Sequence, residues 1–148
     1  MSCPAVYGLN FHHFGLAVRD YDKAARFLEG LGYTIGSRIF DPLQNVEVAI
    51  CDAPEHPTIE LVVAVSDDSP IANVLKRQET SVYHSCYYCV DPSAALAAIE
   101  ADGFPVITVS EPKPAVLFCG AEVLFAYISG FGLIEIINSV EPPPIATR

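Results

Sequence analysis

The chain has 148 residues, of which 51% are hydrophobic, and this length and composition predict one packed core and argue against disorder. Its net charge is −10 with only eight Lys and Arg residues, so the composition argues against the basic surface that nucleic-acid binding requires. No apolar run approaches the roughly 20 residues that span a bilayer, and the N-terminus lacks the basic-then-apolar pattern of a secretory signal, so we expect a cytoplasmic protein without a membrane partner.

The first half of the chain is predicted to form one strand, one helix and three further strands. Alternating side chains predict a strand over residues 11–18. Apolar residues at helical spacing follow, in a helix that Asp20 or Asp22 can cap and that Gly32 ends. Strand-like runs then occur at about 33–40, 46–51 and 58–65.

The second half repeats this order. A strand is predicted over residues 82–90, and a helix near 93–102 begins with Pro92 and Ser93 and ends at Gly103. Later strand-like runs lie at about 105–109, 115–119, 122–128 and 132–138, and two of these runs can belong to one strand. The Pro-rich tail, residues 139–148, is expected to extend outside the fold.

Two segments of the chain align with an offset of 71 residues. In this alignment His13 falls over His84, and each histidine stands seven residues before an aspartate. A duplicated βαβββ unit is the simplest explanation of the repeat. We therefore predict a single α+β domain over residues 1–148, with one module at about 10–66 and the other at about 82–138.

The strand that carries the first histidine has two unlike faces, because side chains alternate across a strand. Gly15 and Ala17 share the face of His13, and these small residues would leave space for a cavity. His12 is expected on the opposite, bulky apolar face, which should meet the helix.

The strand that carries the second histidine contains a Cys-x-x-Cys pair, Cys86 and Cys89. Their spacing of three residues on one strand directs the two thiols to opposite faces, which argues against a zinc or redox pair. Cys86 instead shares the face of His84 and Tyr88. The chain has five cysteines, and an odd number without an export signal predicts reduced thiols.

Each half also has a strand near its end that places one acid in an apolar run, Glu60 in "TIELVVAV" and Glu135 in "GLIEIINS". A carboxylate there is costly unless it is paired, exposed or bound to a metal. Two histidines and two glutamates from duplicated strands can converge on one divalent cation with positions open for substrate. The alternative is a pair of solvent-facing glutamates on edge strands and two polar core histidines.

Together these motifs resemble the vicinal-oxygen-chelate superfamily, which includes glyoxalase I, methylmalonyl-CoA epimerase, extradiol dioxygenases and antibiotic-resistance proteins. The segments that carry the resemblance are "HHFGLAV", "TIELV", "YHSCYYCVD" and "GLIEII", from about residue 10 to residue 138. The resemblance implies two βαβββ modules whose eight strands form a cup around a metal. It implies His13, Glu60, His84 and Glu135 as the ligands of one divalent ion, such as Zn, Ni, Co, Mn or Fe.

Within the superfamily, the chain looks most similar to methylmalonyl-CoA epimerase and the glyoxalase-like proteins grouped with it. Two positions depart from the patterns of these relatives. The epimerase pattern has a catalytic glutamate where this chain has Leu43, with only Gln44 and Glu47 nearby. Glyoxalase I has an arginine for glutathione where this chain has Ala17.

The preferred interpretation is a metal-dependent isomerase or epimerase that removes a proton beside a carbonyl and stabilises the enediolate on the metal. The alternatives are a lactoylglutathione lyase of the glyoxalase I type, an extradiol-type dioxygenase and a non-enzymatic protein that binds small molecules such as antibiotics. In the preferred interpretation Glu135 or Glu60 is the catalytic base. Tyr88, Cys86 and Gln44 are candidates for contact with a small-molecule substrate, an acyl-thioester or a 2-oxo compound, and a homodimer is compatible with this prediction.

Overall fold

The computed structural model describes residues 5–147, which form two α-helices, two short 3-10 helices and ten strands. The helices are α1 (Tyr21–Gly30), η1 (Val74–Lys76), α2 (Pro92–Ala101) and η2 (Val116–Phe118). The strands are β1 (Asn10–Val18), β2 (Thr34–Ile35), β3 (Ile39–Asp41), β4 (Val46–Asp52), β5 (Ile59–Ala64), β6 (Thr80–Cys89), β7 (Val106–Thr108), β8 (Lys113–Pro114), β9 (Glu122–Ile128) and β10 (Gly132–Asn138).

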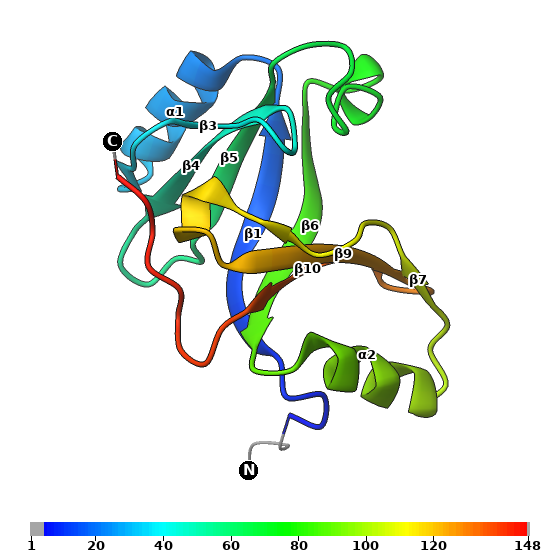
Figure 1. The fold of residues 1–148 in the computed structure, drawn as a ribbon. Helices are drawn as coiled ribbons and strands as arrows, with labels where there is room; N and C mark the ends of the chain where they lie inside the picture. The colour runs from blue at the N-terminus through cyan, green and yellow to red at the C-terminus, as the bar shows by residue number, and fades with distance from the viewer. Residues whose placement is uncertain (1–4, 148) are drawn as a thin grey trace.

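All ten strands belong to one sheet, in which eight follow the order β2-β4-β5-β1-β6-β10-β9-β7. The short strands β3 and β8 pair with β4 and β9 beside this path. The central strands β1 and β6 are antiparallel, and each is parallel to the last strand of its own half, β5 or β10. Figure 1 shows β9 and β10 running across the direction of β4 and β5, so the two halves of the sheet are turned relative to one another. The predicted duplicated α+β fold is confirmed, although the sheet has ten strands where eight were predicted.

Each helix begins with the same cap at equivalent positions of the two halves. Asp20 accepts a hydrogen bond from the backbone of Lys23, and Asp91 accepts one from Ala94, at 3.1 and 3.0 Å. A side-chain acceptor satisfies one of the free amides at a helix start. The two helices then pack on the outer face of the sheet, each over its own half, α1 through Leu28 and α2 through Ile99 among others.

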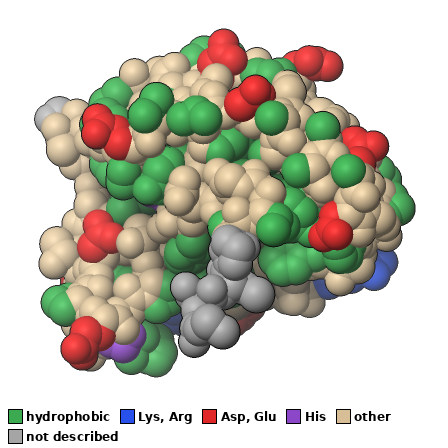
Figure 2. All heavy atoms as spheres, turned by 90° about the horizontal axis from the view of Figure 1, so that it is seen from below, with side chains coloured by type: hydrophobic (Ala, Val, Ile, Leu, Met, Phe, Trp, Pro, Cys, Tyr) green, Lys and Arg blue, Asp and Glu red, His purple; other side chains and the backbone are tan. Residues whose placement is uncertain are grey.

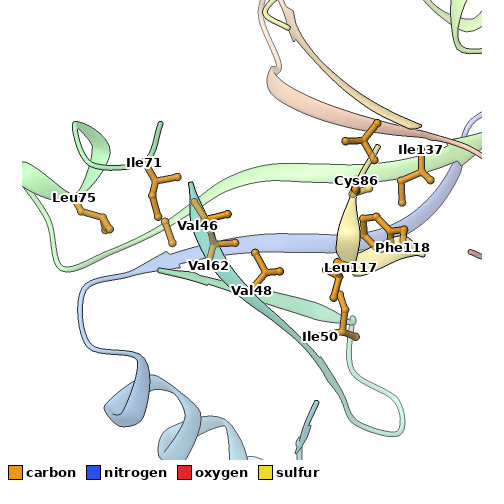
Figure 3. Close-up of a cluster of buried hydrophobic side chains, with 13 residues drawn as sticks. Val46, Val48, Ile50, Val62, Ile71, Leu75, Cys86, Leu117, Phe118 and Ile137 are labelled. Carbon is orange, nitrogen blue, oxygen red and sulfur yellow. The ribbon is translucent and has the colours of Figure 1, made fainter. Parts of the chain in front are cut away.

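The largest core cluster lies between the two halves of the sheet (Figure 3). It joins residues of the first half, such as Val48 and Val62, to Leu117, Phe118 and other residues of the second half. Phe118 is only 2% exposed, so its ring belongs to the packed core between the two halves of the sheet.

Residues 115–119, predicted as strand, mostly form the helix η2, so this prediction is wrong. Cys119 ends the turn with a left-handed φ of 55°, and Gly120 follows at φ 89°. Pro114 and Gly120 bound the apolar run, and a tight turn there directs Leu117 and Phe118 into the core.

The C-terminal tail also differs from expectation, because it follows the fold instead of leaving it. Ile145 packs against the central core cluster, and the amide of Ala146 donates a hydrogen bond of 2.8 Å to the carbonyl of Leu117. Figure 1 shows the tail, in red, returning from β10 toward the first half of the sheet. An apolar residue after the prolines therefore anchors the extended segment.

The surface agrees with the composition. Figure 2 shows a face on which acidic side chains are scattered among apolar ones, while few Lys or Arg side chains are visible. Within residues 5–147, no helix combines the length and the hydropathy needed to cross a bilayer.

Candidate metal centre

The four predicted ligands converge from the four central strands of the sheet. His13 comes from β1, Glu60 from β5, His84 from β6 and Glu135 from β10. Strand register brings them together, because Gly15 on β1 pairs with both Glu60 and His84. All four side chains are buried, with residue exposures of 0%, 5%, 3% and 2% in chain order.

Their ligand atoms surround one point. Glu60 Oε1 lies 3.6 Å from the Nε2 atoms of both His13 and His84. Glu135 Oε1 lies 3.5 Å from His13 Nε2 and 3.4 Å from His84 Nε2, and the two Nε2 atoms are 3.4 Å apart. Ligands bound at about 2.1 Å in a tetrahedron would lie about 3.4 Å from one another. The spacing therefore fits a small divalent cation.

An unsatisfied polar atom points to the same conclusion. Glu135 Oε1 is buried and makes no well-formed hydrogen bond, despite the two imidazole nitrogens nearby. A buried carboxylate oxygen without a partner carries a large desolvation cost. A cation held by this His₂Glu₂ set would remove that cost, so the residues fit a divalent metal site.

The charges of the ligand residues favour a positive charge at the centre of the site. Burial lowers the pKa of His13, but the carboxylates of Glu60 and Glu135 outweigh burial and raise it to about 9. Burial opposes ionisation of Glu135, but His13 and His84 lower its pKa well below the usual range. Without a metal, a proton on His13 therefore supplies positive charge between the carboxylates, and metal binding would displace it.

A glycine makes room for one of the ligands. A Cβ atom on Gly15 would lie 2.1 Å from His84 Cε1 and 2.4 Å from His84 Nδ1. The His84 ring therefore lies directly over the backbone of β1. The prediction that Gly15 and Ala17 form the wall of a cavity is therefore wrong, because the His84 ring covers Gly15 and Ala17 is buried in the central core cluster.

A β-bulge places His12 on the face of His13, so the predicted orientation of His12 is wrong. Phe11 pairs with Tyr87 and His13 pairs with Cys86, which leaves His12 as an extra residue in β1. The Nδ1 atoms of His12 and His13 are 2.7 Å apart. Burial lowers the pKa of His12 to about 4, with a further contribution from His13, so His12 is neutral near pH 7.

The second half of the fold has an equivalent bulge at Tyr83. Gly15 pairs with His84 and Leu16 pairs with Val82, so Tyr83 is the extra residue of β6. Tyr83 is separated from His12 by the same 71 residues that separate the two histidine ligands. The two bulges therefore occupy equivalent positions of the repeat, each directly before a histidine ligand.

A cavity of about 390 Å³ lies on the side of His84, separated from the four ligands by the side chains that line it. Tyr83 and Phe125 line this cavity, and their ring centroids lie 4.4 and 5.4 Å from that of His84. Burial and the carboxylates of Glu60 and Glu135 raise the pKa of Tyr83 well above its usual value, so its hydroxyl stays protonated.

The polar and charged side chains around this cavity are few. Gln44, Ser110 and Lys113 line it beside Tyr83, and Leu43 lies at the same wall. Gln44, a predicted substrate contact, is held by Asp41, whose carboxylate accepts a 3.1 Å hydrogen bond from Gln44 Nε2. None of the described residues that line the cavity is acidic.

The two other predicted substrate contacts lie on the side of His13. Cys86 is fully buried in the central core cluster, and the partly buried Tyr88 packs against that cluster with its ring 6.3 Å from that of His12. Neither residue lines the 390 Å³ cavity, so their contact with substrate stays a prediction. Cys89 belongs to the cluster under α2, on the opposite face from Cys86, which confirms that the two thiols diverge. Cys3, the remaining cysteine of the N-terminal segment, lies outside the described residues.

Two positions singled out by the sequence are occupied by other interactions. Glu47, near the expected epimerase acid, pairs with Arg38 Nε at 2.8 Å. Ala17, where glyoxalase I has an arginine, is 0% exposed in the central core cluster. Neither position offers a free charged group to a substrate.

The family model of the Glyoxalase/Bleomycin resistance protein/Dioxygenase superfamily matches residues 12–125. The matched segment includes His13, Glu60 and His84, and it ends before Glu135. No sequence among curated proteins matches the chain significantly.

Solved structures share the fold at low sequence identity. Methylmalonyl-CoA epimerase from Mycobacterium tuberculosis is 22% identical, with a TM-score of 0.72 over 97% of this chain and 93% of its own. A hypothetical protein from Bacillus halodurans C-125 is 23% identical, with a TM-score of 0.75 over 92% of this chain and 98% of its own. A variant of the Streptomyces coelicolor methylmalonyl-CoA epimerase, in complex with 2-nitronate-propionyl-CoA, is 21% identical, with a TM-score of 0.68 over 89% and 98%.

Proposed function

The chain belongs to the glyoxalase/bleomycin resistance protein/dioxygenase superfamily, and on that premise we propose that it is a divalent-metal-dependent isomerase or epimerase acting beside a carbonyl group. The observation that carries the proposal is the buried set of two histidines and two glutamates next to a cavity. A buried site of this kind excludes water, and a cation held by the two carboxylates and two imidazoles would stabilise the negative charge that develops when a proton leaves carbon.

When bound, a divalent ion stabilises the negative charge that develops on a substrate oxygen as a proton leaves the adjacent carbon. The protein must supply the group that accepts this proton. In the reaction the C–H bond breaks, its electron pair moves toward the carbonyl, and the proton passes to a carboxylate that later returns it. Because no described acid lines the cavity, Glu60 and Glu135 are the candidates for this base.

The residues that line the cavity suit a substrate with an anionic or strongly polar portion. Lys113 is the one charged residue among the described lining residues, and Ser110 and Gln44 add polar groups. The protonated hydroxyl of Tyr83 can donate a hydrogen bond to a substrate oxygen. These groups suit an acyl-thioester or a 2-oxo acid. The Streptomyces coelicolor structural neighbour, a fold relative, was solved with an acyl-CoA analogue.

The other family activities fit the site less well. The buried Ala17 leaves no guanidinium for glutathione at the position where the lyase has one. An iron dioxygenase uses two histidines and one carboxylate, whereas here both Glu60 and Glu135 face the same point. A protein that only sequesters a ligand needs no such buried ligand set.

The proposal can be tested by deuterium exchange. The metal-loaded protein is incubated in D₂O with methylmalonyl-CoA and with a series of 2-oxo acids, and deuterium in the recovered substrate is measured by mass spectrometry. We expect exchange with at least one class, reduced at least 100-fold in Glu135→Gln. Glu122→Gln, at an exposed carboxylate on β9, is the matched control and should exchange normally.

Metal content must be measured on the same samples, because Glu135 is both a ligand and a candidate base. A protein that holds metal but exchanges no substrate proton would contradict the proposed reaction. Turnover of a 2-oxo aldehyde that requires glutathione would favour the lyase instead.

A further inference from the structure

A metal-binding histidine needs a partner for the ring nitrogen that does not face the metal. His13 directs Nε2 toward the other ligands, so its Nδ1 must carry the hydrogen whenever Nε2 binds a cation. Such a hydrogen is almost always donated to an acceptor that fixes the tautomer and the ring orientation. The acceptor usually is a carboxylate, a backbone carbonyl or a water.

In this protein the atom in that position is the Nδ1 of the preceding residue, His12, at 2.7 Å from His13 Nδ1. Because one nitrogen must donate and the other accept, His12 accepts through an unprotonated Nδ1 and carries its own hydrogen on Nε2. The β-bulge makes this contact available, since regular alternation would direct adjacent side chains to opposite faces.

The ring of His12 is also held in place by packing. It meets Phe118 edge to face at 5.6 Å between centroids, and it meets Tyr88 at 6.3 Å. Phe118 in turn lies 5.9 Å from the ring of His13. The acceptor is therefore presented by a side chain with little rotational freedom.

A second metal ion between His12, His13 and Cys86 is a competing interpretation, because these three residues also approach one another. The 2.7 Å separation of the two Nδ1 atoms is a hydrogen-bond distance. Two ligands of one ion would lie about 3.4 Å apart. The pair is therefore a hydrogen bond, with the metal position on the other side of His13.

We infer that His12 is a positioning residue that accepts the Nδ1 hydrogen of His13 and thereby orients His13 Nε2 as a metal ligand. The inference rests on the metal site of the proposed function, but it does not depend on which reaction that site performs. The second histidine has no such support, since His84 Nδ1 is buried without a partner. The duplicated ligands are thus oriented by different means, His13 by His12 and His84 by its contact with Gly15.

Two substitutions separate hydrogen bonding from packing. His12→Phe keeps an aromatic ring against Phe118 and Tyr88 but removes the acceptor. His12→Asn removes the ring but keeps an acceptor atom, Oδ1, at the corresponding distance from the backbone. Wild type and both variants are depleted of metal, and the dissociation constant for Zn²⁺ is measured by competition with a chromophoric chelator.

We expect His12→Phe to weaken Zn²⁺ binding 10- to 100-fold and His12→Asn to stay within about threefold of wild type. In ¹⁵N-edited NMR spectra of the zinc-loaded protein, the His13 Nδ1–H proton should be slow to exchange in wild type and His12→Asn, and lost from the spectrum in His12→Phe. Circular dichroism confirms that each variant is folded.

The outcomes distinguish the two proposals. If wild type binds no Zn²⁺, the metal site itself is wrong. If wild type binds Zn²⁺ and His12→Phe binds it equally well, the role of His12 is wrong while the metal site stands. Equal losses in both variants would also overturn the role of His12 as a hydrogen-bond acceptor, because only the packing of the ring would then matter.

Discussion

Replacement of Gly15 by alanine tests whether the His84 ring is held by its contact with the backbone of β1. The added Cβ would lie 2.1 Å from His84 Cε1, and the ring would have to retreat by about 1.3 Å to reach an ordinary contact of 3.4 Å. Metal–ligand bonds tolerate deviations of only about 0.2 Å. His84 should therefore be lost as a ligand in Gly15→Ala.

The expected result is a loss of Zn²⁺ affinity larger than the 10- to 100-fold that removal of a supporting hydrogen bond causes. Overpacking should also lower the free energy of unfolding by about 1–3 kcal/mol. Chelator competition measures the affinity, and urea denaturation measures the stability.

Two other glycines provide controls. A Cβ on Gly30 meets nothing within 4 Å, so Gly30→Ala should leave affinity unchanged. A Cβ on Gly36 would lie 2.4 Å from the carbonyl oxygen of Ile50, so Gly36→Ala should destabilise the fold without a specific loss of metal affinity. Wild-type affinity and stability in Gly15→Ala would refute the described packing of His84.

Three further predictions concern protonation, thiol reactivity and the missing acid. In chelator-treated protein, His13 has a pKa raised from 6.5 to about 9, so its stabilising effect is complete below about pH 6.5 and is lost as the pH rises through about 9. The free energy of unfolding, measured by urea denaturation, should decrease by up to roughly 3 kcal/mol across this range. An equal decrease in the zinc-loaded protein would contradict this role of the His13 proton. In a Cys3→Ser background at pH 8, iodoacetamide should modify the exposed Cys119. Cys51 should stay unmodified, because it is buried and burial raises its pKa to about 11. Peptide mass mapping measures both modifications. Leu43→Glu should increase exchange of the methylmalonyl-CoA proton at least tenfold if the missing acid limits the reaction, whereas Leu43→Gln, its uncharged control, should not.

The duplication made the ligand set predictable from the sequence. His13 and His84 align through the repeat, and Glu60 and Glu135 are conspicuous because each interrupts an apolar strand. These signals are local and periodic. They predicted a cluster that the fold confirms as four buried side chains around one point.

The orientation of His12 was not predictable in this way, because a β-bulge depends on the pairing of two strands about 70 residues apart. No local pattern distinguishes the extra residue of a bulge from a regular strand position. The helix η2 was misread for a different, local reason, because its apolar residues suit a strand until the turn at Cys119 and Gly120 is known. Strand pairing thus decides the bulge, and the backbone turn at Cys119 and Gly120 decides η2.

The two bulges have a stereochemical consequence. In a symmetric duplicated site, a substrate could approach the ligands from either half of the cup. Here His12 and Phe118 fill the side of His13, whereas Tyr83 borders an open cavity on the side of His84. Under the proposed function, a substrate bound in this cavity would present one of its faces to a given carboxylate, so a nearly symmetric set of ligands would support a reaction with defined handedness.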